Sequence, residues 1–64
     1  MRLLVDGSWQ RFGHVVLAGS PLRLFRLTVG GVAVAEEIEA GREVSRSTLT
    51  DRLTDAGAAH PMPS

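Results

Sequence analysis

The first half of the chain consists of short apolar runs that are separated by turn-forming residues. The runs are residues 3–5, 9–12, 14–18 and 22–27. Each is rich in β-branched, aromatic or aliphatic side chains and is too short for a helix, which is the pattern of strands. The glycines, serines and proline between them indicate turns, so neighbouring strands are expected to be antiparallel. Gly13 would allow a tight hairpin turn between the second and third runs.

A helical pattern replaces the strand pattern after Thr28. Thr28 fits an N-cap, and the apolar residues that follow recur at helical spacing, which predicts a helix over residues 29–40. Gly41 is suited to the left-handed conformation that ends a helix. Gly30 and Gly31 each weaken the first turn by about 1 kcal/mol relative to alanine. Close packing on the sheet would explain why glycine stands there.

A second helix is predicted to begin within residues 45–48 and to end at Gly57. Thr48 and Asp51 fit the spacing of a capping box. The apolar stripe of this helix consists of Leu49, Leu53 and Ala56. Residues 59–64 contain two prolines and are predicted to form an extended linker or tail, of the stiff kind that leads into another domain.

These elements predict a small α+β domain over residues 1–58. We expect an antiparallel sheet of about three strands, followed by two or three helices, in a winged-helix-like arrangement. A domain of 64 residues buries only about 60% of its unfolded surface. It contains no cysteine, so disulfides cannot add stability, and a partner or a neighbouring domain is the expected support.

Composition and charge narrow the possible partners. The hydrophobic fraction of 44% suits a globular chain, and no segment approaches the roughly 20 apolar residues of a membrane span. Residues 1–6 reach a charge too early for a signal peptide, so a cytoplasmic location without a membrane partner is expected. Residues 1–27 hold four arginines and one carboxylate, so an acidic ligand would favour that half.

Residues for catalysis, metal binding or cofactor binding are not found in any recognisable pattern. His14 falls in a predicted strand and His60 in the tail, and neither is near a serine pattern that would make it a catalytic base. Gly30 and Gly31 lack the lysine of a phosphate-binding loop. The carboxylates that we interpret as the solvent-facing side of the first helix are Glu36, Glu37 and Glu39. We therefore predict no catalytic residue, no metal site and no cofactor.

Two stretches resemble a known family. GSPLRLFRLT at residues 19–28 and LTDRLTDAGAAHP at residues 49–61 together resemble the N-terminal region of the mycofactocin-system glycosyltransferases of family 2. The resemblance covers about residues 6–63. It implies a place beside an enzyme that adds glucose units to mycofactocin, a ribosomally derived redox cofactor. The catalytic aspartates and metal motif of such an enzyme are not in this chain.

The N-terminal region of that family is similar to a PqqD-like element, also called a RiPP recognition element, which binds a leader peptide as an added strand. The resemblance implies that the peptide lies between the strand at 22–27 and the helix at 48–56. It implies two partners, a precursor peptide or peptide-derived cofactor intermediate and a glycosyltransferase catalytic domain. The candidate peptide-binding residues are Arg23, Phe25, Arg26, Arg46, Leu49, Arg52 and Leu53. Residues 42–47 are too few for the middle helix of a full PqqD-like domain.

Strand addition is also plausible from the residues alone, because an exposed strand edge offers unpaired backbone groups to a peptide. Alternation places Leu22 and Leu24 on one side of the strand, and Arg23 and Phe25 on the other. Phe25 would then be either a contact residue or part of the core.

The sequence is also compatible with two other functions. The domain could pack on a following glycosyltransferase domain and position it without touching a peptide. It could also be a winged-helix DNA-binding domain that presents Arg46 and Arg52 to phosphates. Asp51 and Asp55 share that surface, which disfavours nucleic acid as a partner.

Overall fold

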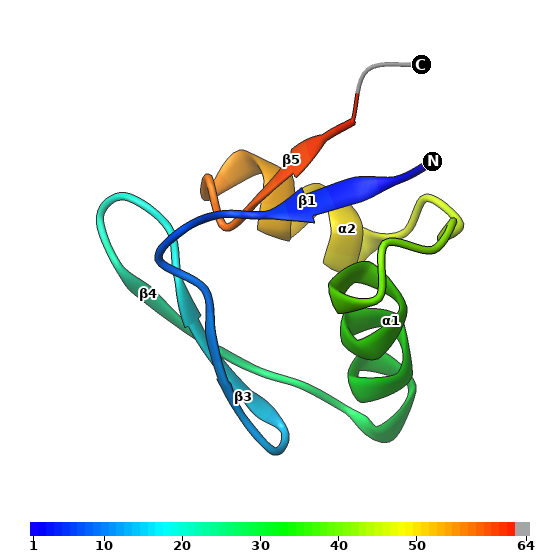
Figure 1. Ribbon diagram of the computed structural model, residues 1–64. Helices are drawn as coiled ribbons and strands as arrows, with labels where there is room; N and C mark the ends of the chain where they lie inside the picture. Colours follow the sequence, from blue (N-terminus) through cyan, green and yellow to red (C-terminus); the bar gives the residue numbers. More distant parts are fainter. Residues whose placement is uncertain (63–64) are drawn as a thin grey trace.

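The computed structural model describes residues 1–62 and has the predicted α+β architecture, with two small antiparallel sheets and two helices (Figure 1). In chain order the elements are β1 (Leu3–Val5), β2 (Gln10–Phe12), β3 (Val15–Ala18), β4 (Arg23–Arg26), α1 (Val29–Glu39), α2 (Thr48–Asp55) and β5 (Ala59–Pro61). Each of the four predicted strands and both predicted helices is present, with bounds within one or two residues of the expected ones.

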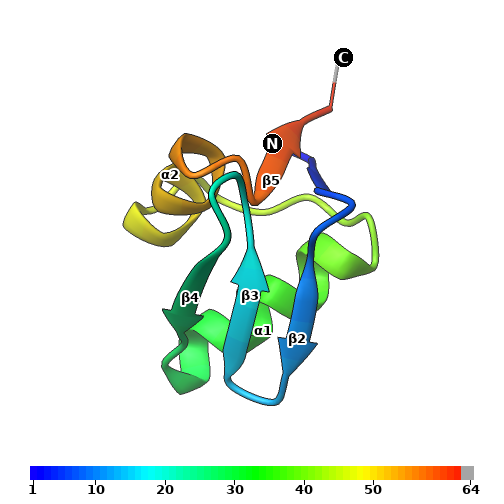
Figure 2. The ribbon, with the colours of Figure 1, turned by 90° about the vertical axis from the view of Figure 1, so that its left-hand side faces the viewer.

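The larger sheet has the order β2-β3-β4, with both pairs antiparallel. β2 and β3 form the hairpin that was predicted around Gly13, whose φ of 62° requires the left-handed conformation that glycine adopts freely. Helix α1 covers one face of this sheet (Figure 2). Because the strand order is β2-β3-β4, β4 lies at one edge of the sheet, with β3 as its only hydrogen-bonded neighbour among the described residues.

The second sheet joins the two ends of the chain. β1 pairs with β5 in antiparallel register, with Leu4 opposite His60. Residues 59–61 are extended as predicted, but they form a strand inside the domain and not a linker, because Ala59 is fully buried and paired with Val5. Of the rest of the predicted tail, residue 62 is described, and residues 63–64 lie outside the described part of the chain.

The helix caps follow the predicted chemistry with one shift. The side chain of Thr28 accepts a hydrogen bond from the backbone N–H of Gly31 and caps α1. Helix α2 is capped by Ser47, within the predicted start at residues 45–48, but its capping box joins Ser47 to Thr50 and not Thr48 to Asp51. Both helices are followed by a glycine with positive φ, as predicted.

The segment between the helices is a loop that binds the N-terminus. The backbone of Val44 exchanges hydrogen bonds with Met1, and Glu43 forms a single bridge with Arg2. Residues 42–47 contain no helix, which agrees with their short length. The described chain therefore has two helices, the lower of the two numbers predicted.

The core lies between the sheets and the helices. Its buried apolar residues are Leu3, Val16, Ala18, Phe25, Leu27, Ala35, Ile38, Val44, Leu53, Ala58 and Ala59. The alternation predicted for β4 is present, and its buried side is the one that carries Phe25, which is 7% exposed. Leu24 is 57% exposed on the opposite side, so the outer face of the larger sheet is partly apolar.

Candidate functional site

The outer edge of β4 presents unpaired backbone groups. The backbone N–H of Leu27 donates to the carbonyl of His14 at 2.7 Å, and Phe25 lies opposite Val16. Successive residues of an antiparallel strand direct their N–H and C=O groups alternately to one neighbour and to the other side. The N–H and C=O groups of Leu24 and Arg26 therefore point away from β3. Within residues 1–62, no other segment forms a backbone hydrogen bond with them.

Two cavities lie beside this edge, between β4 and the helices. The first has a volume of about 440 Å³, and we call it the Arg26 cavity. It is lined by Arg26, Leu27, Thr28, Gly30, Gly31, Val34, Ser47, Thr48, Leu49 and Arg52. The second has a volume of about 480 Å³, and we call it the Arg23 cavity. It is lined by Arg23, Leu24, Phe25, Arg52, Asp55 and Ala56. Because Arg52 lines both, they are neighbours, and together we call them the β4–α2 groove.

The first turn of α1 forms one wall of the Arg26 cavity. A Cβ atom on Gly31 would lie 3.3 Å from the Cβ of Leu27 and 3.4 Å from Cδ2 of Leu49. Gly31 therefore lets α1 approach Leu49 of α2 closely. The predicted close approach is present, but its main partners are the residue after β4 and a residue of α2. A Cβ on Gly30 would meet only Oγ1 of Thr28, at 3.9 Å.

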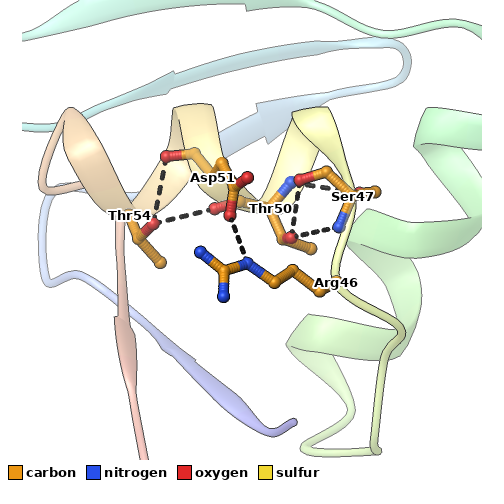
Figure 3. A network of polar contacts seen from close by, with 5 residues as sticks. All are labelled: Arg46, Ser47, Thr50, Asp51 and Thr54. Carbon is orange, nitrogen blue, oxygen red and sulfur yellow. Dashed lines mark hydrogen bonds and ion pairs between the residues drawn. The ribbon is translucent and has the colours of Figure 1, made fainter.

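The opposite wall is α2, whose first turn is held by a network of hydroxyl groups (Figure 3). The N–H of Thr50 donates to Oγ of Ser47 at 3.2 Å, and the N–H of Ser47 donates to Oγ1 of Thr50 at 2.8 Å. The hydroxyl of Thr54 donates to the carbonyl of Thr50 at 3.0 Å. Thr50 is fully buried, so its hydrogen bonds anchor the helix start and thereby position Leu49 and Arg52 beside the groove.

The arginines divide into paired and unpaired groups. The ion pairs, all between an arginine and a glutamate or aspartate, are Arg11 with Glu39, Arg42 with Glu37, and Arg46 with Asp51. In the described part of the chain, no ion pair involves Arg2, Arg23, Arg26 or Arg52. Three of these four line the β4–α2 groove. The groove therefore carries uncompensated positive charge, with Asp55 as the one carboxylate in its lining.

The structure brings four of the seven predicted site residues together at accessible positions of the groove. Arg26, Leu49 and Arg52 meet at the Arg26 cavity, and Arg23 lies at the other cavity. All three arginines are exposed, and Leu49 is half-buried. These four side chains can contact a ligand without any rearrangement of the core.

The other three predicted site residues are placed differently. Phe25 lines the Arg23 cavity but belongs mainly to the core. A place in the core was the stated alternative to a contact role for Phe25. Leu53 is fully buried and lines neither cavity of the groove, so it belongs to the core and is not accessible to a peptide in this structure. Nε of Arg46 lies 3.2 Å from Oδ1 of Asp51 (Figure 3). Arg46 also lines a separate cavity together with Met1.

Several lining residues were not predicted as part of the site. They are Leu27, Thr28, Gly30, Gly31, Val34, Ser47 and Thr48. One sequence pattern could have indicated these lining residues, namely the adjacent glycines in the first turn of a helix. Glycines leave backbone exposed where a side chain would otherwise stand. The approach of two helix starts to the same cavity depends on tertiary packing and has no local pattern.

A polar cluster that the sequence did not reveal lies between the ends of β1 and β5. Nε2 of His60 is 2.7 Å from Oδ1 of Asp6, and Oδ2 of Asp6 accepts a hydrogen bond from the N–H of Ser8 at 3.0 Å. The hydrogen bond with His60, followed by those from Ser8, holds the pKa of Asp6 well below its ordinary value. The hydroxyl of Ser8 bonds to Asp6 and to the N–H of Gly19. Both partners of Ser8 Oγ are thus structural, and the cluster joins distant segments.

A second cluster joins the larger sheet to α1. Oε2 of Glu39 accepts hydrogen bonds from Nε1 of Trp9 at 2.8 Å and from Nε of Arg11 at 2.9 Å. Burial opposes the charged form of Glu39, but the hydrogen bonds from Arg11 and Trp9 outweigh it and lower the pKa of this carboxyl. The predicted solvent-facing side of α1 is therefore anchored to the sheet at Glu39.

Metal binding and membrane crossing each require features that residues 1–62 lack. Within this range, no three His, Cys, Asp or Glu side chains gather closely enough to hold a metal ion. Neither helix in this range has the length and apolar character needed to cross a membrane. The β4–α2 groove itself offers unpaired backbone groups of β4, apolar side chains and guanidinium groups.

Comparison with known proteins adds no relative: no family model, no curated protein and no solved structure gives a significant match to the chain.

Proposed function

We propose that this chain is a peptide-recognition domain that binds an extended peptide as an additional strand on the free edge of β4. The observation that carries the proposal is the outward direction of the N–H and C=O groups of Leu24 and Arg26, next to the β4–α2 groove. Backbone hydrogen bonds would supply affinity, and the two cavities would select side chains.

The sequence resemblance supports a particular peptide. The N-terminal region of mycofactocin-system glycosyltransferases would bind the precursor peptide, or an intermediate made from it, between its last strand and last helix. In this chain β4 and α2 flank the groove in that way. The glycosyl transfer would be performed by a catalytic domain outside this chain, and the proposed location is the cytoplasm.

The first turn of α1 supports the groove in the absence of a middle helix. Gly30, Gly31 and Val34 of α1 line the Arg26 cavity together with Leu49 of α2. A peptide laid along β4 would therefore meet a wall on the side of both helices. The short loop at residues 42–47 does not remove the binding surface that the proposal requires.

A structural role is the second candidate, and one observation favours it. The outer face of the larger sheet exposes Phe12 (62%) and Leu24 (57%), and Leu22 beside it is 60% exposed. A neighbouring glycosyltransferase domain could cover this face and be positioned by it. In that case, deletion of residues 1–58 would destabilise the enzyme without changing its affinity for the peptide.

The test of peptide recognition is a proline substitution at Leu24. The N–H of Leu24 points away from β3, so Leu24→Pro removes a donor from the free edge without removing a hydrogen bond of the sheet. We expect this variant to keep its circular dichroism spectrum and to bind the mycofactocin precursor peptide at least about tenfold more weakly, as for the loss of a buried hydrogen bond. Isothermal titration calorimetry measures the affinity.

Leu24→Ala is the matched control, because it shortens the same side chain and retains the N–H group. It should bind the peptide within about threefold of the unmodified chain, since Leu24 is mostly exposed. Equal affinities of the proline and alanine variants, or no binding by the unmodified chain, would contradict strand addition at β4.

A further inference from the structure

The charge and shape of the groove restrict which peptide it can hold. Resting on the proposed function, we infer that the bound peptide carries an acidic side chain directly next to a large apolar one, at the position opposite Arg26. The apolar side chain enters the Arg26 cavity, and the carboxylate lies beside the guanidinium groups of Arg26 and Arg52.

The acidic preference follows from the unpaired arginines. Arg26 and Arg52 line the Arg26 cavity, and no carboxylate belongs to its lining. At the Arg23 cavity, by contrast, Asp55 accompanies Arg23 and Arg52. The positive potential is therefore strongest at the Arg26 end, and an acidic group gains most there. The chain has zero formal charge, so this preference is local and does not come from net attraction.

The apolar preference follows from the walls of the same cavity. Leu27, Val34 and Leu49 line it, and the two glycines of α1 leave room where side chains would stand. Its volume of about 440 Å³ lies within the usual range of ligand pockets. A large aliphatic or aromatic side chain would remove apolar surface from water on both sides of the contact.

The adjacency of the two side chains follows from strand geometry. Phe25 is buried on the inner face of β4, so the neighbouring Arg26 directs its side chain to the outer face and edge. A residue paired with Arg26 on an added strand would share that face, where an opposite charge is favoured. The next residue of the peptide would point to the inner face, over the Arg26 cavity. The preferred pair is therefore an acidic residue followed or preceded by an apolar one.

The experiment compares synthetic peptides that alternate threonine and valine and are blocked at both ends. Their central pairs are Glu-Leu, Gln-Leu and Glu-Ser. We expect the Glu-Leu peptide to bind about threefold to tenfold more tightly than the Gln-Leu peptide, as for one or two partly exposed ion pairs. The Glu-Ser peptide should bind about tenfold more weakly than Glu-Leu, because it leaves the cavity wall exposed. NMR titrations that follow the amides of Leu24 and Arg26 measure these affinities.

Arginine variants identify the source of the charge preference. Arg26→Gln and Arg52→Gln should each reduce the preference for Glu-Leu over Gln-Leu, and the double variant should abolish it. Arg2→Gln makes the same change of charge at an arginine that is also unpaired within residues 1–62 but lines neither cavity, so it should leave the preference unchanged.

The outcomes separate the inference from the proposed function. If the precursor peptide binds at β4 but the Glu-Leu and Gln-Leu peptides have equal affinity, or neither binds, the acidic preference is wrong and strand addition stands. Equal affinity of Glu-Leu and Glu-Ser would exclude the apolar subsite. Failure of the precursor peptide to shift the amides of Leu24 and Arg26 would contradict the proposed function, and the inference with it.

Discussion

Asp6 is the side chain through which pH should act most directly on the stability of this domain. Its carboxylate binds His60 and Ser8, which lowers its pKa far below the ordinary 3.8. The unfolded state then takes up a proton at a higher pH than the folded state does. The stabilisation is present above about pH 4, where both states are ionised, and is lost progressively as the pH falls below the unfolded pKa.

The prediction is that Asp6→Asn removes this acid dependence. The variant should be less stable than the unmodified chain at neutral pH, and the difference between them should shrink as the pH falls from about 5 toward 2. Chemical denaturation followed by Trp9 fluorescence across this range measures both stabilities. Asp55→Asn is the control, because Asp55 belongs to no ion pair within residues 1–62. A pH-independent difference for Asp6→Asn would contradict the account.

Sequence alone predicted the unpaired arginines only in part. The excess of arginine in residues 1–27 indicated an acidic ligand for that half, and Arg23 and Arg26 indeed line the groove. Which arginines are neutralised depends on neighbours in space. Arg46 was predicted to be available to a ligand, but it forms an ion pair with Asp51 in the first turn of α2. Arg52, which also lies on α2, has no such partner in the described residues.

The glycines in the first turn of α1 affect both the stability of the helix and the shape of the groove. Gly30 and Gly31 are adjacent, but their surroundings differ. A Cβ on Gly30 would have only Thr28 Oγ1 within 4 Å, whereas a Cβ on Gly31 would press on Leu27 and Leu49 at 3.3 and 3.4 Å. The two positions therefore separate the intrinsic cost of glycine in a helix from the benefit of close packing.

We predict different changes in stability for the two alanine substitutions. Gly30→Ala should raise the free energy of unfolding by about 0.4–1 kcal/mol, because alanine restricts the unfolded chain and favours the helix. Gly31→Ala should gain less than this or lower the stability, since Leu49 would have to move by a few tenths of an ångström. Urea denaturation of the two variants and the unmodified chain measures the difference. Equal stabilisation by both would show that Gly31 has no packing role.

Local patterns predicted the elements well because each element depends on its own residues. The strand runs and the cap at Thr28 were placed correctly, since side-chain alternation and a capping hydroxyl operate over a few residues. The start of α2 was predicted only as within residues 45–48, and the capping box was assigned to Thr48 and Asp51, because Ser47 and Thr48 have similar chemistry. Only the backbone geometry, with Ser47 extended and Thr48 helical, decides between them.

The pairing of β1 with β5 was not predictable in the same way. It joins Leu4 to His60 across nearly the full length of the chain, and the prolines nearby favoured a linker. No local pattern in the sequence between β1 and β5 indicates that these two strands pair (Figure 1). The same limit applies to the Arg26 cavity, which forms only when the starts of α1 and α2 come together beside β4.

Within residues 1–62, the larger sheet has two edge strands, β2 and β4, and of these β4 is the one that borders the groove. β3 is flanked on both sides, and β1 and β5 pair with each other, while β4 has the β4–α2 groove on its outer side. An open edge of this kind is a hazard for aggregation unless a partner or charged side chains cover it. Arg23 and Arg26 on β4 provide charge in the free state, and a bound peptide would complete the sheet.

Backbone amide hydrogen exchange is the most direct test of this account, with the mycofactocin precursor peptide as ligand. In the free domain the amides of Leu24 and Arg26 should exchange rapidly, whereas that of Phe25, which faces β3, should be protected. Saturating peptide should slow exchange at Leu24 and Arg26 and leave the pattern at Phe25 unchanged. Binding of the peptide with no added protection at Leu24 and Arg26 would contradict strand addition at the β4 edge.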